Sequence, residues 1–498
     1  MTAIDRPRRV PELFAEQVSV RPDAPALVDD SGTCSYRRLH DLVRERAATL
    51  RGLGVEPGDR VALELPRSGE YLVALLAVWT LGAVAVPLDP DAPAERRVHQ
   101  IRTAGCRAAL TGGGGDGVAV DAAAGVARGE RWGLVPPSGD EAAYVLFTSG
   151  SSGRPKGVQV GHRSLAGLLT DFADRLPAGP GHLVLSLTTP VFDVSLLEML
   201  LPLVTGGAVA MAPARAHFDL EGLAAWLERR PVSVAQATPT WWRLALPFVG
   251  PALRGAVLLT AGEALSTDLA RRLRECSEEV WNLYGPTEAT IYTTAWKVVD
   301  DMADPLPIGF PVAGAAVRIA GPDGGAVPTG TAGELLVGGP GLAHGYIGDR
   351  ELTAAKFRVG AGGTTEYHTG DLCRVAPNGV FEYLGRMDNQ VKIRGRRVEP
   401  EELEAVAQQH PAVVSAVALA RERGHETVLD LVVKLSTGEP TTRRELRAVL
   451  SRRLPEHMLP RHVYVADDIP LTASGKVDRR EVARILDGGT DLFRRLTR

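Results

Sequence analysis

Residues 148–157, Thr-Ser-Gly-Ser-Ser-Gly-Arg-Pro-Lys-Gly, combine hydroxyl groups, glycines and a lysine in the way that an anion-binding loop requires. Glycines let successive backbone N–H groups turn toward an anion, and hydroxyl groups add further donors. The segment is not a Walker A loop, because Gly157 stands where that motif needs serine or threonine after the lysine. Since it directly follows the apolar residues 143–147, it is better explained as a polyphosphate loop after a buried strand than as a flexible linker.

Two further short motifs carry groups that suit a nucleotide. They are Asn-Leu-Tyr-Gly-Pro-Thr-Glu at 282–288 and Tyr-His-Thr-Gly-Asp-Leu at 367–372. An aromatic ring can stack on a purine, a loop carboxylate can hold Mg²⁺ through its oxygens, and another carboxylate can accept hydrogen bonds from ribose hydroxyls. Each motif alone is equally well explained as a turn between strands.

The elements that must position these residues follow an alternating pattern. Helical patterns alternate with short apolar segments such as 60–65, 83–88 and 183–187 over roughly the first 380 residues, which predicts an α/β fold with mostly parallel sheets. A basic, glycine-punctuated stretch at 385–397 marks a boundary. We therefore expect a core domain at 1–385 and a small α+β domain at 391–498, joined by a short boundary segment at 386–390.

Composition and charge exclude several classes of function. The formal net charge of −4 gives no reason to expect nucleic acid or an acidic membrane surface as a partner. Cys34, Cys106, Cys276 and Cys373 lie far apart without a CxxC pair, which favours a reduced cytoplasmic protein without disulfides or a zinc site. The uncharged stretch 71–88 is expected to form a buried helix and a buried strand rather than a membrane span.

Taken together, the motifs resemble those of the adenylate-forming superfamily, and within it the amino-acid adenylation domains of nonribosomal peptide synthesis. Ser152 stands where the family more often has threonine, and it keeps the hydroxyl group. The resemblance implies a large N-terminal adenylate-forming domain and a small mobile C-terminal domain. The matching segments follow in family order at 81–93, 147–158, 192–195, 282–288, 333–346, 367–372, 385–404 and 470–479.

The resemblance also implies a role for individual residues. Tyr284 would stack on adenine, Glu288 would bind Mg²⁺, Asp371 would anchor the ribose, Lys476 would bridge the substrate carboxylate and the α-phosphate, and Asp388 would be the hinge. The remaining residues expected around ATP are Thr148, Ser149, Gly150, Ser151, Ser152, Gly153 and Lys156 at the phosphates, and Gly262, Glu263, Asn282, Leu283, Gly285, Pro286, Thr287, Tyr383 and Arg386 around the nucleoside.

By the same resemblance, Asp193 binds the α-amino group of an amino acid, next to a side-chain pocket. The predicted pocket residues carry no charge and are bulky, so they leave room for a small neutral side chain. Their combination is similar to that of glycine-activating domains, with Ala261 in place of the usual glycine and Tyr292 in place of tryptophan. We expect glycine, then alanine, then proline. The pocket residues are Val194, Leu197, Gln236, Leu259, Ala261, Leu283, Ile291 and Tyr292, with Lys476 at the carboxylate.

The expected reaction uses ATP and Mg²⁺ to form an aminoacyl-AMP, which then passes its acyl group to the phosphopantetheine thiol of a carrier protein. Gly488-Gly489-Thr490-Asp491 lacks the serine that a carrier needs, so we expect a free-standing enzyme and a carrier in trans. The need for a small accessory protein is left open. A D-alanine–carrier ligase and an acyl- or aryl-CoA ligase are alternatives, the latter disfavoured because Asp193 would find no partner charge. A silent scaffold is disfavoured because Lys476, Glu288 and Asp371 are all present.

Overall fold

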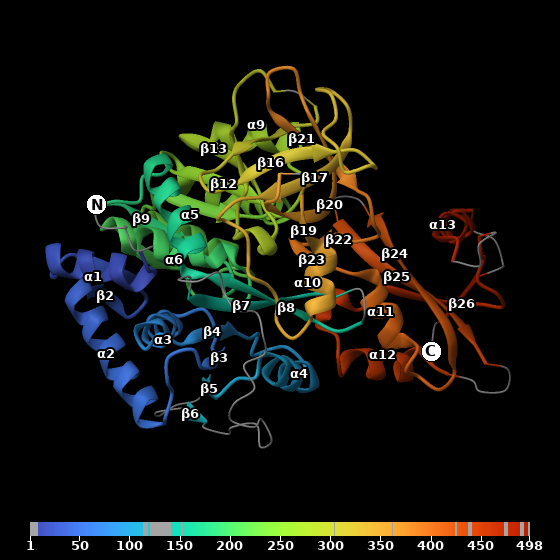
Figure 1. Ribbon diagram of the computed structural model, residues 1–498, viewed down its shortest axis with the longest axis horizontal. Helices are drawn as coiled ribbons and strands as arrows, with labels where there is room; N and C mark the ends of the chain where they lie inside the picture. Colours follow the sequence, from blue (N-terminus) through green and yellow to red (C-terminus); the bar gives the residue numbers. More distant parts are fainter. Residues whose placement is uncertain are drawn as a thin grey trace. The chain divides into compact units, whose positions relative to one another are not determined.

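The computed structural model describes residues 8–112, 118–119, 141–150, 153–302, 304–360, 362–423, 426–436, 441–472, 477–488 and 493–496. The chain divides into two compact units (Figure 1). The first comprises Met1–Pro90, Ile101–Leu146 and Gly157–Met387. The second comprises Asp91–Gln100, Phe147–Lys156 and Asp388–Arg498.

A large mixed sheet forms the centre of the first unit. Its strand order is β16-β17-β20-β21-β15-β14-β13-β12-β11-β9-β10-β1-β2, with β19 beside β20. The strands are β1 (Pro25–Asp29), β2 (Gly32–Ser35), β9 (Leu183–Ser186), β10 (Ala208–Met211), β11 (Val234–Ala237), β12 (Val257–Ala261), β13 (Glu279–Tyr284), β14 (Thr294–Lys297), β15 (Pro307–Pro311), β16 (Ala316–Ala320), β17 (Gly333–Gly338), β19 (Phe357–Val359), β20 (Thr365–Val375) and β21 (Phe381–Arg386).

The α/β class is confirmed, but parallel pairing covers less of this sheet than the sequence predicts. Parallel pairs join β1, β10, β9, β11, β12 and β13 in turn. From β13 onward the neighbours are antiparallel. The difference arises because β14–β15, β16–β17 and β20–β21 are each joined by a loop, whereas parallel neighbours need a crossover connection.

A second sheet of the first unit has the order β18-β8-β7-β4-β3-β5-β6. Its inner pairs β3–β4, β3–β5 and β4–β7 are parallel. Its strands are β3 (Arg60–Glu64), β4 (Val84–Pro87), β5 (Ala108–Thr111), β6 (Val118–Ala119), β7 (Ala142–Thr148), β8 (Lys156–Gly161) and β18 (Gly345–Tyr346).

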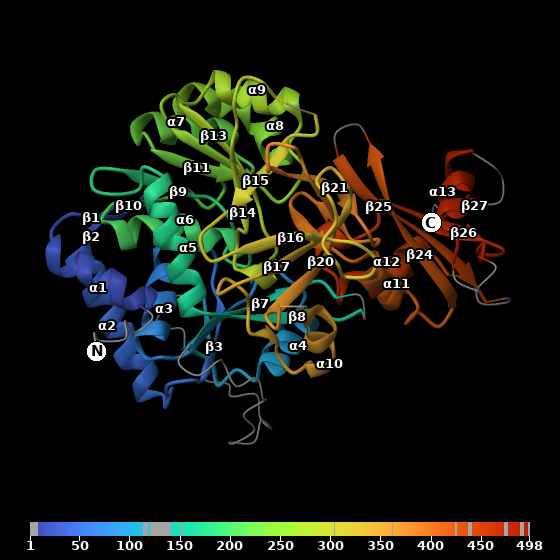
Figure 2. The ribbon, with the colours of Figure 1, turned by 45° about the horizontal axis from the view of Figure 1, so that its top comes forward.

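Helices cover both faces of the large sheet, as the alternation of strands and helices requires. Helices α7, α8 and α9 pack on one face around Trp226, Trp242 and Leu258 (Figure 2). Helices α3, α5 and α6 belong to the core on the other face. The helices are α1 (Val10–Val20), α2 (Tyr36–Gly52), α3 (Gly69–Thr80), α4 (Ala94–Ala104), α5 (His162–Arg175), α6 (Val194–Thr205), α7 (Leu220–Arg229), α8 (Pro239–Val249), α9 (Thr267–Glu275) and α10 (Arg350–Lys356).

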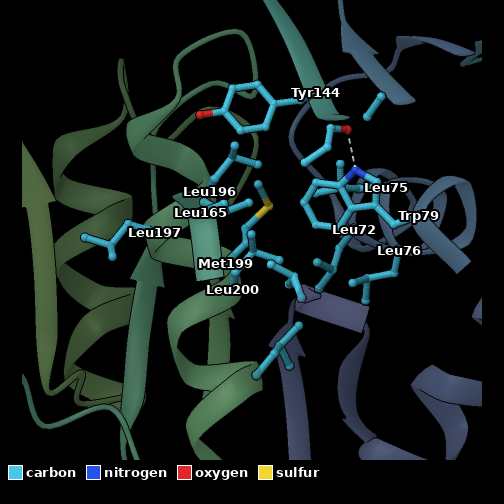
Figure 3. Packing of buried hydrophobic residues seen from close by; sticks show 14 of the residues in the cluster. Leu72, Leu75, Leu76, Trp79, Tyr144, Leu165, Leu196, Leu197, Met199 and Leu200 are labelled. Carbon is cyan, nitrogen blue, oxygen red and sulfur yellow. Dashed lines mark hydrogen bonds between the residues drawn. The ribbon is translucent and has the colours of Figure 1, made fainter. Parts of the chain in front are cut away.

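Helix α6 is apolar around almost its whole circumference, which is typical of a helix buried on all sides. Figure 3 shows Leu196, Met199 and Leu200 of α6 facing α3, whereas Leu197 points away from α3. On α3, Trp79 is fully buried and donates from Nε1 to the carbonyl of Ala143 at 2.6 Å, so the polar atom of this large side chain is satisfied.

The apolar stretch 71–88 forms α3 and β4, as the sequence predicts. In the part of the chain that the structure describes, no helix has both the length and the apolar character of a membrane span. The thiols of Cys34, Cys106, Cys276 and Cys373 are free, which agrees with the expectation of no disulfide framework.

The second unit contains an α+β domain, as predicted for the residues after the basic stretch. Its sheet has the order β24-β25-β26-β27 and mixes antiparallel and parallel pairs. A short hairpin, β22–β23, precedes it. The elements are β22 (Val391–Ile393), β23 (Arg396–Val398), α11 (Pro400–Ala407), β24 (Val413–Arg423), β25 (Glu426–Leu435), α12 (Arg443–Ser451), β26 (His462–Ala466), α13 (Arg479–Asp487) and β27 (Phe493–Arg495).

Candidate functional site

Strand β13 delivers neighbouring residues to two different sides of the large sheet. Successive side chains of a strand point to opposite faces. Leu283 accordingly joins the core that contains α6, whereas Tyr284 joins a separate cluster with Ile308 and Phe381. The chain then turns sharply at Gly285, where an added Cβ would lie 2.3 Å from the carbonyl oxygen of Ile291, so only glycine fits.

The predicted adenine and ribose residues come together around one carboxylate. Asp371 on β20 is paired in register with Arg386 on β21, whose Nη1 lies 2.9 Å from Asp371 Oδ1. The hydroxyl of Tyr284 donates to Asp371 Oδ2 at 2.5 Å. The ring of Tyr383 lies 6.3 Å from that of Tyr284. The structure therefore gathers all four residues, while their contacts with ATP stay a prediction.

Glu288 lies in a short 3₁₀ turn, Thr287–Ala289, directly after β13. Its side chain is fully buried, and the hydroxyl of Tyr346 donates to its Oε1 at 2.7 Å. Because the hydroxyl of Tyr346 holds one carboxylate oxygen of Glu288, the direction of the second oxygen is also fixed. Because carboxylate oxygens are the ligands that Mg²⁺ prefers, the chemistry of this donor fits the predicted metal.

Asp193 precedes α6 and is 9% exposed. Its Oδ2 is buried and has no hydrogen-bond partner among the described residues. The pKa of Asp193 is raised to about 6, chiefly by burial and also by nearby Glu288, while hydrogen bonds from Thr287 and the backbone offset part of the rise. A buried carboxylate oxygen without a hydrogen-bond donor is costly unless a donor or cation completes it, so this oxygen suits an ammonium ion.

The predicted side-chain pocket residues converge at the carboxyl ends of three adjacent parallel strands, where open α/β sheets bind ligands. Gln236 on β11 is in register with Leu259 on β12, and Ala261 on β12 is in register with Leu283 on β13. Val194 and Leu197 come from the first turn of α6. Ile291 and Tyr292, both buried, follow the 3₁₀ turn and complete the group.

The turn before Tyr292 has a strained backbone. Thr290 and Ile291 have φ angles of 59° and 65°. Branched side chains rarely adopt this left-handed region, and such strain persists only where surrounding contacts impose it. Here the hydroxyl of Thr290 donates to the carbonyl of Gly341 at 2.7 Å, and Ile291 is buried in the core.

Glu198 is a polar pocket neighbour that the sequence analysis missed. It lies on α6, is 2% exposed, and lines a cavity together with Leu197, Gln236 and Leu259. The predicted pocket set is uncharged as expected, yet a carboxylate stands directly beside it. A glutamate within the otherwise apolar segment 194–205 was the available signal, since a buried charge needs partners.

The predicted phosphate loop begins at the end of β7. The hydroxyl oxygen of Thr148 is buried and has no partner among the described residues. An added Cβ on Gly150 would lie 2.1 Å from the carbonyl oxygen of Arg154, and Gly153 has a φ of 80°, so both positions require glycine. Lys156 begins β8. Ser151 and Ser152 lie outside the described residues.

Contacts of this loop place it in the second compact unit. The hydroxyl of Ser149 donates to the carbonyl of Arg397 at 2.8 Å, and the N–H of Gly150 lies 3.3 Å from Glu402 Oε2. The other predicted nucleotide residues with described positions belong to the first unit, whereas the predicted hinge residue Asp388 begins the C-terminal segment of the second. Asp388 Oδ1 accepts from the N–H of Gln390 at 3.2 Å. Lys476 lies outside the described residues.

Some predicted residues have structural partners for their side chains. Glu263 accepts from the N–H and the hydroxyl of Thr240 at 2.9 and 2.7 Å, at the start of α8. Asn282 donates to the carbonyl of Pro307 at 2.7 Å. Gly262 has a φ of 87° and turns the chain after β12. Because the Glu263 carboxylate binds Thr240 and Gly262 has no side chain, we expect both residues to contact a ligand through their backbone groups.

Comparison with known proteins gives matches along most of the chain. A family model described as AMP-binding enzyme matches residues 14–347, and one described as AMP-binding enzyme C-terminal domain matches residues 402–476. A dimodular nonribosomal peptide synthase of Bacillus subtilis (strain 168) is 35% identical over 488 residues, which is 94% of this chain and 20% of the relative. The chain thus spans a fifth of that curated relative's length.

Solved structures of nonribosomal peptide synthetase proteins are also similar to this chain. A nonribosomal peptide synthetase protein containing adenylation and PCP domains, bound to a vinylsulfonamide inhibitor, is 28% identical with a TM-score of 0.81, over 96% of this chain and 84% of that one. A four-domain nonribosomal peptide synthetase bound to AMP and glycine is 35% identical with a TM-score of 0.69, over 95% of this chain and 36% of that one.

Proposed function

The chain belongs to the family of AMP-binding enzymes, within the adenylate-forming superfamily, and we propose on that premise that it activates a small neutral amino acid. The amino acid carboxylate would attack ATP to give aminoacyl-AMP and pyrophosphate, with Mg²⁺ compensating phosphate charge. The phosphopantetheine thiol of a carrier protein would then take the aminoacyl group and release AMP. The observation that carries the proposal is the buried Oδ2 of Asp193, which has no hydrogen-bond partner among the described residues and directly precedes the predicted pocket residue Val194. An ammonium group would complete this carboxylate, and a fatty or aryl acid would not.

The chemistry of the first step needs positioning and charge compensation. The substrate carboxylate is already ionised near pH 7, so it needs no general base to attack the α-phosphate. Two anions repel, and the ammonium group of Lys476 would offset that repulsion in the transition state. Glu288 would hold Mg²⁺, which supplies further compensation of phosphate charge when bound. Asp193 would orient the substrate by its amine, and Tyr284 and Asp371 would hold adenine and ribose.

For the second step, a thiol must reach the carbonyl carbon where Lys476 had acted. A rotation of the small domain about Asp388 would remove Lys476 from that centre, because a few residues at a domain boundary can absorb a large φ/ψ change. Relatives that contain PCP domains support a carrier protein as the thiol donor. Free coenzyme A is the competing acceptor, and loading of coenzyme A in preference to carriers would contradict this part of the proposal.

Glycine is the favoured substrate, followed by alanine and proline. Crowding supports this order, because the predicted pocket residues Leu197, Leu259, Leu283 and Tyr292 are each at most 2% exposed and so are densely packed. The related four-domain protein that binds glycine adds support.

Amino-acid-dependent exchange of pyrophosphate into ATP tests the proposal. The panel includes L- and D-amino acids, fatty acids and aryl acids. We expect the highest kcat/KM with glycine or alanine and none with acids that lack an α-amine. Fastest exchange with D-alanine would identify the D-alanine–carrier ligase alternative, and fastest exchange with an aryl or fatty acid would refute amino-acid activation.

Amino-acid binding should weaken in mild acid. The pKa of Asp193 is raised to about 6, so its carboxyl group is neutral below that pH and loses its attraction for the substrate ammonium group. We expect kcat/KM for the amino acid to fall about tenfold per pH unit below about pH 6, while KM for ATP changes little. The variant Glu198→Gln should show the same inflection of kcat/KM near pH 6, because Asp193 is unchanged in it. A profile that is flat from pH 5 to 8 would contradict the role of Asp193.

Shortening a pocket wall should admit larger substrates. Leu283→Ala or Leu197→Ala should raise kcat/KM for valine relative to glycine by at least about tenfold, because one methylene in an apolar pocket is worth about 1–3 kcal/mol. Leu258→Ala is the matched control, since Leu258 is equally buried but belongs to the core on the other face of the sheet. Equal substrate ratios in the pocket and control variants would show that the pocket is assigned wrongly.

A further inference from the structure

Glu198 is surrounded by hydrogen-bond donors. Its Oε2 accepts from the backbone N–H groups of Leu187 and Thr188 at 2.8 and 2.9 Å. Its Oε1 accepts from the hydroxyl of Thr188 at 2.5 Å and from Nε2 of Gln236 at 3.2 Å. A carboxylate that accepts from four donors can remain charged inside an apolar core. Burial nevertheless raises the pKa of Glu198 to about 7.

This carboxylate determines which way the amide of Gln236 faces. A carboxylate only accepts hydrogen bonds, so the amide nitrogen must point toward Glu198. The same nitrogen lies 3.4 Å from the carbonyl oxygen of Val194. The amide oxygen is then directed at Tyr292, whose hydroxyl donates to it at 2.6 Å. Burial keeps the pKa of Tyr292 well above its usual value, so the phenol remains a donor.

Hydrogen bonds link the side chains of Thr188, Glu198, Gln236 and Tyr292 in series. Their polar groups are therefore paired with one another. Gln236 and Tyr292 belong to the predicted side-chain pocket, yet their amide and hydroxyl groups are engaged with each other and with Glu198. The ring of Tyr292 is also fixed from the side by Phe172, at a centroid distance of 5.6 Å. We call Gln236 and Tyr292 the pocket floor. Because their polar groups are already paired, they limit the space for a substrate side chain rather than hydrogen-bond to it.

Little space remains beneath this floor. The cavity lined by Leu197, Glu198, Gln236 and Leu259 measures about 10 Å³. A water molecule needs about 10–15 Å³ of such space, so the cavity holds at most one. A substrate side chain can reach this cavity only if Gln236, which lines it, moves.

We propose that Glu198 is a specificity-determining positioning residue that holds Gln236 and Tyr292 across the pocket floor and thereby limits the substrate to the smallest amino acids. The inference rests on the proposed function, because it concerns the same pocket. Glu198 acts through Gln236 and does not touch the substrate. Its loss would free the Gln236 side chain to adopt other rotamers and would deepen the pocket.

The test compares Glu198→Gln, Gln236→Leu and the double variant in pyrophosphate exchange. Glutamine is nearly isosteric with glutamate but brings N–H donors into a site where four donors converge. We expect each single variant to raise the kcat/KM ratio of the next larger aliphatic amino acid to the preferred one by about tenfold, mainly through KM. KM for ATP should not change. The double variant should show no further shift, because the effect of Glu198 passes through Gln236.

The variant Glu382→Gln is the matched control. Glu382 is a buried carboxylate paired with Arg374 at 2.5 Å on β20–β21, and its loss should lower thermal stability without changing the substrate ratio. An unchanged ratio in Glu198→Gln, or shifts that add in the double variant, would overturn the inference. If Glu198→Gln does not fold, unchanged ratios in both Gln236→Leu and Tyr292→Phe overturn it. Absence of exchange with any amino acid in the unmodified protein would instead refute the proposed function.

Discussion

Replacing Lys476 by alanine should lower aminoacyl-adenylate formation by at least about 10²-fold, the usual cost of one preorganised electrostatic contact. In the proposed mechanism, the first half-reaction brings a carboxylate onto an anionic phosphate, and the ammonium group of Lys476 would offset the repulsion. The second half-reaction has a neutral thioester product and does not join two anions. Transfer from supplied aminoacyl-AMP to a carrier thiol should therefore fall much less. Pyrophosphate exchange measures the first step, and carrier loading from synthetic adenylate measures the second.

Lys434→Ala is a suitable control for this experiment. Lys434 belongs to the same domain, is partly exposed, and pairs with Asp468 at 2.8 Å. Exposed ion pairs contribute little to stability, so both half-reactions should continue at the rates of the unmodified enzyme. Equal losses of both half-reactions in Lys476→Ala would assign the lysine a structural role and contradict the proposed mechanism.

The variant Asp193→Asn should lower kcat/KM for the amino acid by about 10²–10³-fold while making the folded protein more stable. Removing one member of a buried charge pair costs about 2–5 kcal/mol, which gives the loss in exchange. The gain in stability has a separate origin. The carboxylate is buried and its Oδ2 has no hydrogen-bond partner among the described residues, so asparagine avoids the cost of burying that charge.

The sign of the stability change follows from the pKa. The pKa of Asp193 rises from 3.8 to about 6 on folding, so the native state binds more protons than the unfolded state between these values. Stability from this group therefore falls as pH rises through that window. The increase in melting temperature of Asp193→Asn over the unmodified protein should be larger at pH 8 than at pH 5. Asp171→Asn, which removes a partner of Arg175 on α5, serves as the control and should leave exchange intact.

A lower melting temperature of Asp193→Asn at pH 8, together with normal exchange, would remove Asp193 from the site. A lower melting temperature with lost exchange would instead assign the carboxylate a structural role. The expected combination, lost exchange in a more stable protein, is the one that distinguishes a binding group from a structural one.

Much of the site could be predicted from the sequence because the relevant residues occur in short contiguous motifs. Tyr284 ends β13, Glu288 lies in the short turn after it, and Asp371 lies within β20, and each belongs to a short motif that resembles one of the family's. The α/β class and the α+β character of the second unit followed from periodicity in the same way. These features depend on neighbours along the chain.

The features that the sequence did not predict depend on contacts between distant segments. The role of Glu198 depends on Thr188 and Gln236, which are 10 and 38 residues away along the chain. The antiparallel half of the large sheet depends on how strands β14–β21 find their neighbours, and apolar strands of either kind look alike in sequence. The membership of residues 91–100 and 147–156 in the second unit likewise arises from tertiary contacts such as that of Gly150 with Glu402.

Strand β13 carries a predicted substrate-pocket residue and a predicted nucleotide-site residue on its two opposite faces. Leu283 faces the predicted amino-acid pocket, and Tyr284, one residue later, faces the cluster beside Asp371. If the proposed pocket is correct, substitutions at Leu283 would change substrate preference while the predicted nucleotide face keeps its geometry. Related enzymes would then gain new substrates by single substitutions without an intermediate that has lost ATP binding. Libraries for directed evolution should accordingly vary positions 259, 261 and 283 and hold position 284 fixed.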